Sequence, residues 1–245
     1  MKTSLNNIRR RGLVWLRHIQ LRSGSGFKNQ ASRYLFLVSC FLFLVLSSVQ
    51  GVGQVTQNDF QMRNSFEASI KLVKKLRLNL TPELRIDETF SIDRFLMACE
   101  LAYKPWKFLE VGGSYQFIVN PRVGKTTEFL NRYAFQVTFS KKIKRFDPAF
   151  RLKYTNYAED DPNSQFLKYK ASVQYDIRKC KLTPSVGIEA YHQLNDNYLY
   201  KMRYSIGARY AIFKNNSIEL EYKFDYYVKE YRNKHIISIS YKIKL

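Results

Sequence analysis

Histidine is the residue type best suited to acid–base chemistry near neutral pH, and beyond residue 53 the sequence has two, His192 and His235. A hydrolytic site would also need a nucleophile or a second acid–base group held beside the histidine. The polar neighbours of His192 in the sequence are Gln193 and Asn195, and no Ser or Asp stands at a diagnostic spacing. We therefore expect no catalytic site. The alternative is a lipid- or peptide-modifying enzyme with its site near His192.

Metal and cofactor chemistry have even less support in the sequence. The three cysteines, Cys40, Cys99 and Cys180, form no Cys-x-x-Cys pair and show no spacing typical of metal ligands. We expect no metal and no cofactor.

Charged side chains at alternate positions are the remaining candidates for chemistry. Two carboxylates side by side can act as acid and base, but unlike charges on neighbouring strands pair with one another instead. We predict a lattice of ion pairs that fills the narrow lumen of a barrel. Its members are Arg77, Glu83, Arg85, Glu100, Glu110, Arg132, Arg151, Glu189, Arg203, Arg209, Glu219 and Glu221.

The elements that must position these charges are β-strands. Along Leu76–Ile86, every even position is Leu, Pro or Ile, and every odd position is polar. A period of two predicts a strand whose two faces meet different environments. The segment also has about the length that crosses a bilayer at a steep tilt.

The same alternation recurs up to Leu245, in eleven segments that begin near Phe60. In the longest, Tyr198–Ile212, we assign Tyr200 to the apolar face. Short Lys-rich turns alternate with longer loops such as the acidic Ala158–Gln165, a connection pattern typical of outer-membrane barrels. Because bacterial single-chain barrels usually have an even number of strands, we predict an all-β, antiparallel up-and-down transmembrane β-barrel of 10–12 strands.

The direction of the two faces decides between a membrane barrel and a soluble one. Polar faces carry unlike charges strand after strand, and apolar faces carry Tyr and Phe towards their ends, as at a membrane interface. The final Tyr241-x-Ile-x-Leu245 is an alternating apolar ending like the insertion signal of outer-membrane barrels. We therefore predict that the apolar faces contact lipid. A soluble barrel with an apolar ligand inside is the other arrangement.

Residues 1–53 differ from the rest of the chain in holding Lys and Arg but no acidic residue. Tyr34–Leu46 is an apolar run of about the length of a signal-peptide core, and small residues at Gly51 and Gly53 fit cleavage before Gln54. We predict a basic leader and signal peptide over residues 1–53 and the barrel over residues 54–245. A membrane anchor that stays on the protein is the alternative, although the run is short for a span.

The net charge of +21 first suggests a nucleic-acid partner. The basic residues alternate with acidic ones and form no single stripe, so we expect no nucleic acid. The partners we expect are outer-membrane lipid and, through the C-terminal strand, the barrel-assembly machinery; the ligand stays open. The predicted location is the outer membrane of a Gram-negative bacterium, and the predicted role is structural, binding or that of a narrow pore.

Several short pieces together resemble an uncharacterised family of outer-membrane barrels, the domain of unknown function 2490. These pieces are Lys74-Lys-Leu-Arg-Leu-Asn-Leu-Thr-Pro-Glu-Leu-Arg85, Glu100-Leu-Ala-Tyr-Lys104, Gly112-Gly-Ser-Tyr115 and Asn131-Arg-Tyr133. The resemblance extends over nearly all of residues 55–245. It implies a barrel and an outer-membrane location, and it carries over no activity and no catalytic residues.

Overall fold

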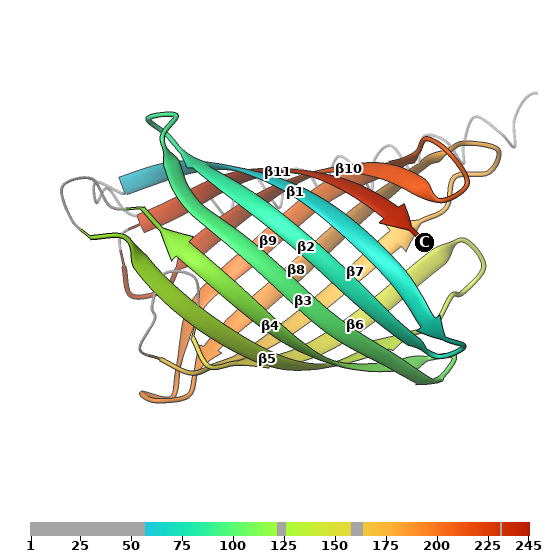
Figure 1. The fold of residues 1–245 in the computed structure, drawn as a ribbon, viewed down its shortest axis with the longest axis horizontal. Helices are drawn as coiled ribbons and strands as arrows, with labels where there is room; N and C mark the ends of the chain where they lie inside the picture. Colours follow the sequence, from blue (N-terminus) through green and yellow to red (C-terminus); the bar gives the residue numbers. More distant parts are fainter. Residues whose placement is uncertain (1–56, 122–125, 158–163, 231) are drawn as a thin grey trace, which may run out of the picture. The chain divides into compact units, whose positions relative to one another are not determined.

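The computed structural model describes residues 57–121, 126–157, 164–230 and 232–245, which form a closed barrel of eleven strands (Figure 1). The strands are β1 (Gln57–Val73), β2 (Leu76–Asp87), β3 (Ile92–Trp106), β4 (Leu109–Asn120), β5 (Glu128–Ser140), β6 (Phe146–Thr155), β7 (Phe166–Tyr175), β8 (Leu182–Gln193), β9 (Tyr198–Ala211), β10 (Asn216–Tyr227) and β11 (Arg232–Lys244). The leader predicted over residues 1–53 and most of the acidic loop 158–165 lie outside the described residues. In the described part of the chain, no helix has the length and apolar character of a membrane span.

The predicted all-β barrel of 10–12 strands is confirmed. Each strand from β1 to β11 pairs antiparallel with the next one in the sequence, as in an up-and-down barrel. The alternating segment Leu76–Ile86 corresponds to β2, which extends one residue further, to Asp87.

The closure of the barrel differs from the prediction of antiparallel pairing throughout. Because strand direction alternates, an odd number of strands makes the first and last run the same way. Strands β1 and β11 accordingly pair in parallel, from Gln57 opposite Arg232 to Ser69 opposite Lys244. On the inner face the hydroxyls of Ser65 and Ser240 are hydrogen-bonded at 2.7 Å across this seam.

The two faces of the barrel wall have opposite chemistry. Large apolar side chains are exposed on the outside, among them Phe135 (65%), Ile206 (60%) and Leu220 (54%). The charged residues between them point inward, where Arg85, Arg203 and other polar side chains are buried. The predicted direction of the alternation is thus confirmed, and the charged interior does not suit an apolar ligand.

Tyr200 lies on the face opposite to its prediction. Tyr200 is buried inside the barrel, with 6% of its surface exposed. Between β8 and β9 the register shifts, so that Tyr191 is opposite Lys201 but His192 is opposite Leu199. The extra residue of this β-bulge is Tyr200, and a bulge re-aims its side chain.

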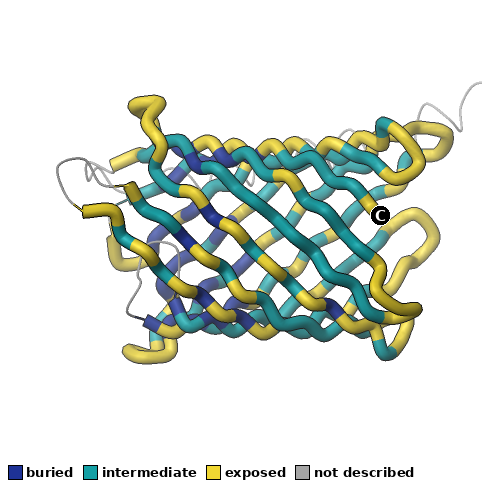
Figure 2. Tube along the Cα trace, viewed as in Figure 1, coloured by how far each residue is buried: buried dark blue, intermediate teal, exposed yellow. Residues whose placement is uncertain are grey.

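The two ends of the barrel differ in their connections. The end of the barrel at which β11 finishes is called the turn end. Its connections span residues 74–75, 107–108, 141–145, 176–181 and 212–215. The opposite, loop end has connections 88–91, 121–127, 156–165, 194–197 and 228–231. The longest connections are at the loop end, and Figure 2 shows that the buried segments gather toward it, away from the C-terminus.

Candidate functional site

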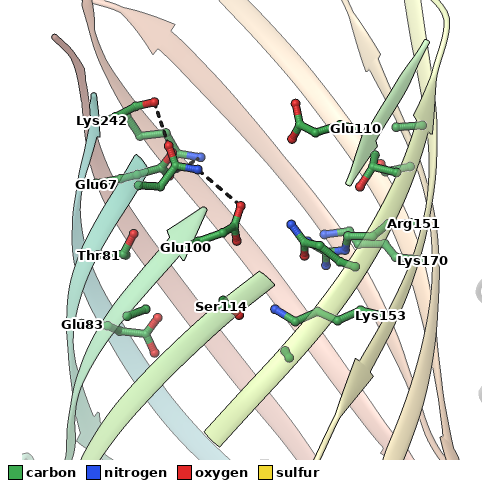
Figure 3. A pocket seen from close by; sticks show the side chains of 18 of the residues that line it. Glu67, Thr81, Glu83, Glu100, Glu110, Ser114, Arg151, Lys153, Lys170 and Lys242 are labelled. Atoms are coloured by element: carbon green, nitrogen blue, oxygen red, sulfur yellow. Dashed lines mark hydrogen bonds and ion pairs between the residues drawn. The ribbon is translucent and has the colours of Figure 1, made fainter. Parts of the chain in front are cut away.

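The candidate site is a cavity of about 790 Å³ inside the barrel, shown from close by in Figure 3. Its lining includes Ser140, Ser217 and Lys244 near the turn end and reaches Leu96, Thr155 and Tyr191 deeper in the lumen. Small inward-facing residues make this room: Ala149, Ser172 and Gly187 stand directly opposite one another on β6, β7 and β8. The predicted charge lattice thus lines this cavity and does not fill it.

All twelve residues of the predicted lattice are on the inner face. Nine of them line the cavity. The other three are joined to lining residues by ion pairs: Arg203 to Glu189, Glu219 to Arg209 and Glu221 to Lys223. The inward placement follows from strand parity, because residues two apart on a strand share a face.

Part of this lattice is paired as expected. Arg77 on β2 bonds to Glu110 on β4, and Arg85 Nε lies 2.6 Å from Glu83 Oε1 on the same strand. Near the turn end, Lys242 bridges two carboxylates, Glu67 at 3.2 Å and Glu219 at 2.9 Å. These bonds hold side chains against the wall and leave the middle of the cavity open.

At the loop end the lumen is packed instead of open. Phe166, Tyr191, Tyr200 and Tyr227 form one buried cluster, contributed by β7, β8, β9 and β10. Beside these rings the carboxylate of Asp225 forms ion pairs with Lys201 Nζ at 2.9 Å and with Arg203 Nε at 2.6 Å. The side chains of Lys201 and Asp225 have no exposed surface. A second cluster of Leu96, Ile118 and Tyr157 fills the opposite wall.

The prediction missed the lysines. The predicted lattice holds six arginines and six glutamates and is neutral. The residues that line the cavity include twelve basic and six acidic ones, because lysines such as Lys153, Lys168, Lys170 and Lys242 also point inward. Strand parity could have found them, since they occupy the same face as Arg151 and Glu189.

The histidines take no part in this site. His192 belongs to the outer face of β8, and its Nε2 atom lies 2.8 Å from Asn197 Oδ1, its hydrogen-bond partner. His235 bonds to the hydroxyl of Tyr222 at 2.7 Å and stacks on Phe60. Among the described residues, neither histidine has a hydrogen bond to a Ser or a carboxylate. Within the same residues no group of three His, Cys, Asp or Glu side chains is placed to hold a metal ion.

Comparison with known families adds one finding. The family model described as a protein of unknown function (DUF2490) matches residues 60–234, which covers β2 to β10 completely, β1 from Phe60 onward and β11 only up to Lys234. The chain belongs to this family. The resemblance noted in the sequence is thus confirmed for this DUF2490 barrel. A comparison with curated protein sequences finds no match.

The chemistry available to the DUF2490 barrel is therefore that of its lumen. Most of its carboxylates pair with arginines, lysines or amides, an arrangement that suits binding of charged groups better than proton transfer. Arg and Lys side chains that point into a cavity attract anions, and the excess of basic residues sets the sign of that attraction.

Proposed function

We propose that this DUF2490 protein is a barrel of the outer membrane of a Gram-negative bacterium, with a non-enzymatic role in which the lumen binds a solute or forms a narrow pore. The observation that carries the proposal is the sidedness of the wall, apolar outside and charged inside. A water-soluble barrel needs the reverse. The exposed apolar side chains form a belt around the barrel, and such a belt suits contact with the acyl chains of a bilayer.

The lengths of the connections support an orientation in that membrane. Outer-membrane barrels have short periplasmic turns and longer external loops. By this rule the turn end faces the periplasm, and the cavity lining that begins there is reached from that side. The packed clusters then lie toward the cell exterior.

The last strand supports the expected route of insertion. Ile239, Tyr241 and Ile243 of β11 alternate with lumen-facing residues on the outer face. We propose that the barrel-assembly machinery recognises this strand and that it joins β1 when the barrel closes.

Cell fractionation tests the location. The full-length protein, expressed in a Gram-negative host, should sediment with outer membranes and resist extraction by salt. Unboiled and boiled samples should migrate differently in gels, because a closed barrel resists detergent until it is heated. Recovery as a detergent-free periplasmic protein would contradict the proposal.

Planar-bilayer recording tests the role. The refolded protein should show a small conductance, because described side chains fill the lumen at the loop end. Replacing Phe166 and Tyr200 together by Ala should raise the conductance, whereas Phe135→Ala on the outer face should leave it unchanged. A large conductance that the double variant does not alter would argue against a narrow lumen.

A further inference from the structure

A row of charges runs around the inside of the barrel and alternates in sign over six strands. Its members are Lys170 on β7, Glu189 on β8, Arg203 on β9, Asp225 on β10, Lys234 on β11 and Asp59 on β1, each directly opposite the next. Directly opposed unlike charges stabilise a sheet, and like charges destabilise it. This row is therefore ordered as folding stability requires.

A neighbouring row alternates between tyrosines and lysines. Tyr227, Lys201, Tyr191 and Lys168 stand directly opposite one another on β10, β9, β8 and β7. Lys201 Nζ lies 4.9 Å from the ring centre of Tyr227 and 4.8 Å from that of Tyr191, and Lys168 Nζ lies 4.7 Å from Tyr191. Rings of this kind attract ammonium groups at such distances.

Both rows lose their order at the same place, the β6–β7 pair. There Arg151 is directly opposite Lys170, and Lys153 is directly opposite Lys168. Four cations thus meet on adjacent positions of two strands, an arrangement that costs folding stability by itself. In both rows the alternation ends at the β6–β7 boundary, and a negative charge placed there would offset the repulsion between the four cations.

Among the described residues, little negative charge is placed against Arg151, Lys153 and Lys170. The carboxylate of Glu189, directly opposite Lys170, already pairs with Arg151 at 3.2 Å and Arg203 at 4.0 Å and accepts a hydrogen bond from the hydroxyl of Tyr191 at 3.0 Å. Lys153 and Lys170 make no hydrogen bond or ion pair with any described residue. The Nε atom of Arg151 is buried and also has no hydrogen-bond partner among the described residues.

Three carboxylates lie across the cavity from these cations, whereas Asp147 shares β6 with Arg151 and Lys153. Figure 3 shows Arg151, Lys153 and Lys170 on one wall and Glu67, Glu83 and Glu100 across from them. The acidic wall has its own donors: Glu67 pairs with Lys242, Glu83 with Arg85, and Glu100 accepts a bond from Asn79. The space beside the cations is thus open to a solute.

We propose that Arg151, Lys153, Lys168 and Lys170, the basic wall, bind the oxyanion group of a small solute, a carboxylate or a phosphate. The guanidinium of Arg151 and the ammonium groups of Lys153 and Lys170 donate charge-assisted hydrogen bonds to its oxygens. The anion also removes the repulsion between the two like-charged pairs. This proposal specifies the class of ligand for the binding role proposed above, and it therefore rests on that proposed function.

Thermal unfolding of the full-length barrel in micelles of an uncharged detergent tests the site. Phosphate and succinate, each titrated into Tris-chloride buffer, are compared with sodium chloride at equal ionic strength. We expect at least one oxyanion to raise the unfolding midpoint beyond the effect of chloride. An effect of phosphate alone identifies a phosphate ligand, and an effect of succinate alone identifies a carboxylate.

Variants locate the binding. Lys153→Gln and Lys170→Gln should each weaken the effective oxyanion by about tenfold, the loss expected for one charge-assisted hydrogen bond. Lys142→Gln is the matched control, because Lys142 is an exposed lysine of the turn end, paired with Asp176 at 3.0 Å. It should bind as the unchanged protein does. Without oxyanion, Lys170→Gln should keep or raise the midpoint, since it relieves repulsion.

Three results would overturn the site: equal effects of chloride and both oxyanions, unchanged binding in the two variants, or a lower midpoint of Lys170→Gln without oxyanion, which would make Lys170 a structural partner. The assay needs neither a membrane nor a conductance. Failure of the anion site is thereby distinguished from failure of the outer-membrane proposal, which fractionation decides.

Discussion

Near the loop end of the lumen, Lys201 and Arg203 are buried and share the carboxylate of Asp225 under a layer of aromatic rings. Further toward the turn end, Lys153 and Lys170 face a cavity and have no ion-pair partner in the described part of the chain. Both regions belong to the inner face of the barrel and carry charged side chains. They differ in the size of the inward-facing neighbours and in the order of the charges.

This difference separates what holds the barrel together from what it offers to a solute. Where inward residues are large and their charges alternate, the lumen is a solid core. Where they are small, as at Ala149 and Ser172, the wall recedes and charges remain available. A single barrel can therefore be rigid at one end and receptive at the other.

The largest expected effect is the loss of Asp225. In Asp225→Asn, Lys201 and Arg203 stay buried and lose the carboxylate that they share. Breaking a buried pair in this way lowers the free energy of unfolding by roughly 3–5 kcal/mol. Urea-induced unfolding of the refolded protein in micelles, followed by aromatic fluorescence, measures the change.

Glu100→Gln is the matched substitution in the open region. Glu100 faces the cavity, where water can solvate its neighbours, and its hydrogen-bond partner is Asn79 at 3.3 Å. We expect a loss below about 1 kcal/mol, as for solvated ion interactions. Equal losses in the two variants would show that the two regions do not differ in the way described.

Packing gives the next largest contrast. Phe166 is fully buried at the loop end, and Phe166→Ala should lower the free energy of unfolding by about 3 kcal/mol through the cavity it leaves. Ser172→Leu enlarges a side chain in the open region, between Ala149 and Gly187. It should cost less than about 1 kcal/mol, because overpacking arises only where space is already filled.

The same unfolding assay checks both packing variants. Calorimetric titration with the oxyanion that stabilises the barrel, phosphate or succinate, adds a second measurement, because Leu at position 172 narrows the cavity beside Lys170. Strong destabilisation by Ser172→Leu would mean that the cavity is not open to added volume.

Much of the fold followed from one periodicity. The alternation of Leu76–Ile86 predicted β2 to within one residue, and parity placed all twelve lattice residues on the inner face. Periodicity works here because each strand has one apolar and one polar environment. It failed at Tyr200, where a bulge inserts one residue and reverses the parity locally.

Other features depend on information that alternation does not contain. Whether β1 joins β11 is a matter of closure, and the odd strand number only then requires a parallel seam. The cavity depends on which small residues become neighbours, such as Ser172 and Gly187, and that follows from register. The excess of inward-facing lysines could be read from the sequence, but the register that places like charges opposite one another on β6 and β7 could not.

The smallest effect concerns a second loop-end carboxylate, which tests whether burial or the number of hydrogen bonds sets the contrast. Asp87 closes the β2–β3 turn, beyond the apolar belt. It accepts hydrogen bonds from the hydroxyls of Thr89 and Ser91, both at 2.7 Å, and from their backbone N–H groups at 2.9 and 3.0 Å. The hydroxyl of Thr89, then that of Ser91, lowers the pKa of Asp87 from 3.8 to about 2.

A lowered pKa means that Asp87 stabilises the fold above the pKa of the unfolded chain, near 4, and that this contribution is lost as the pH falls toward 2. Because solvent screens the turn, we expect the contribution to be only about 0.5 kcal/mol. Unfolding of Asp87→Asn should therefore depend less on pH between 5 and 2 than unfolding of the unchanged protein, with almost equal stability at pH 7. If Asp87→Asn instead destabilised the barrel as much as Asp225→Asn, hydrogen-bond number and not burial would distinguish the two regions. The small effect expected here and the large one at Asp225 together locate the stability of the loop end in its interior.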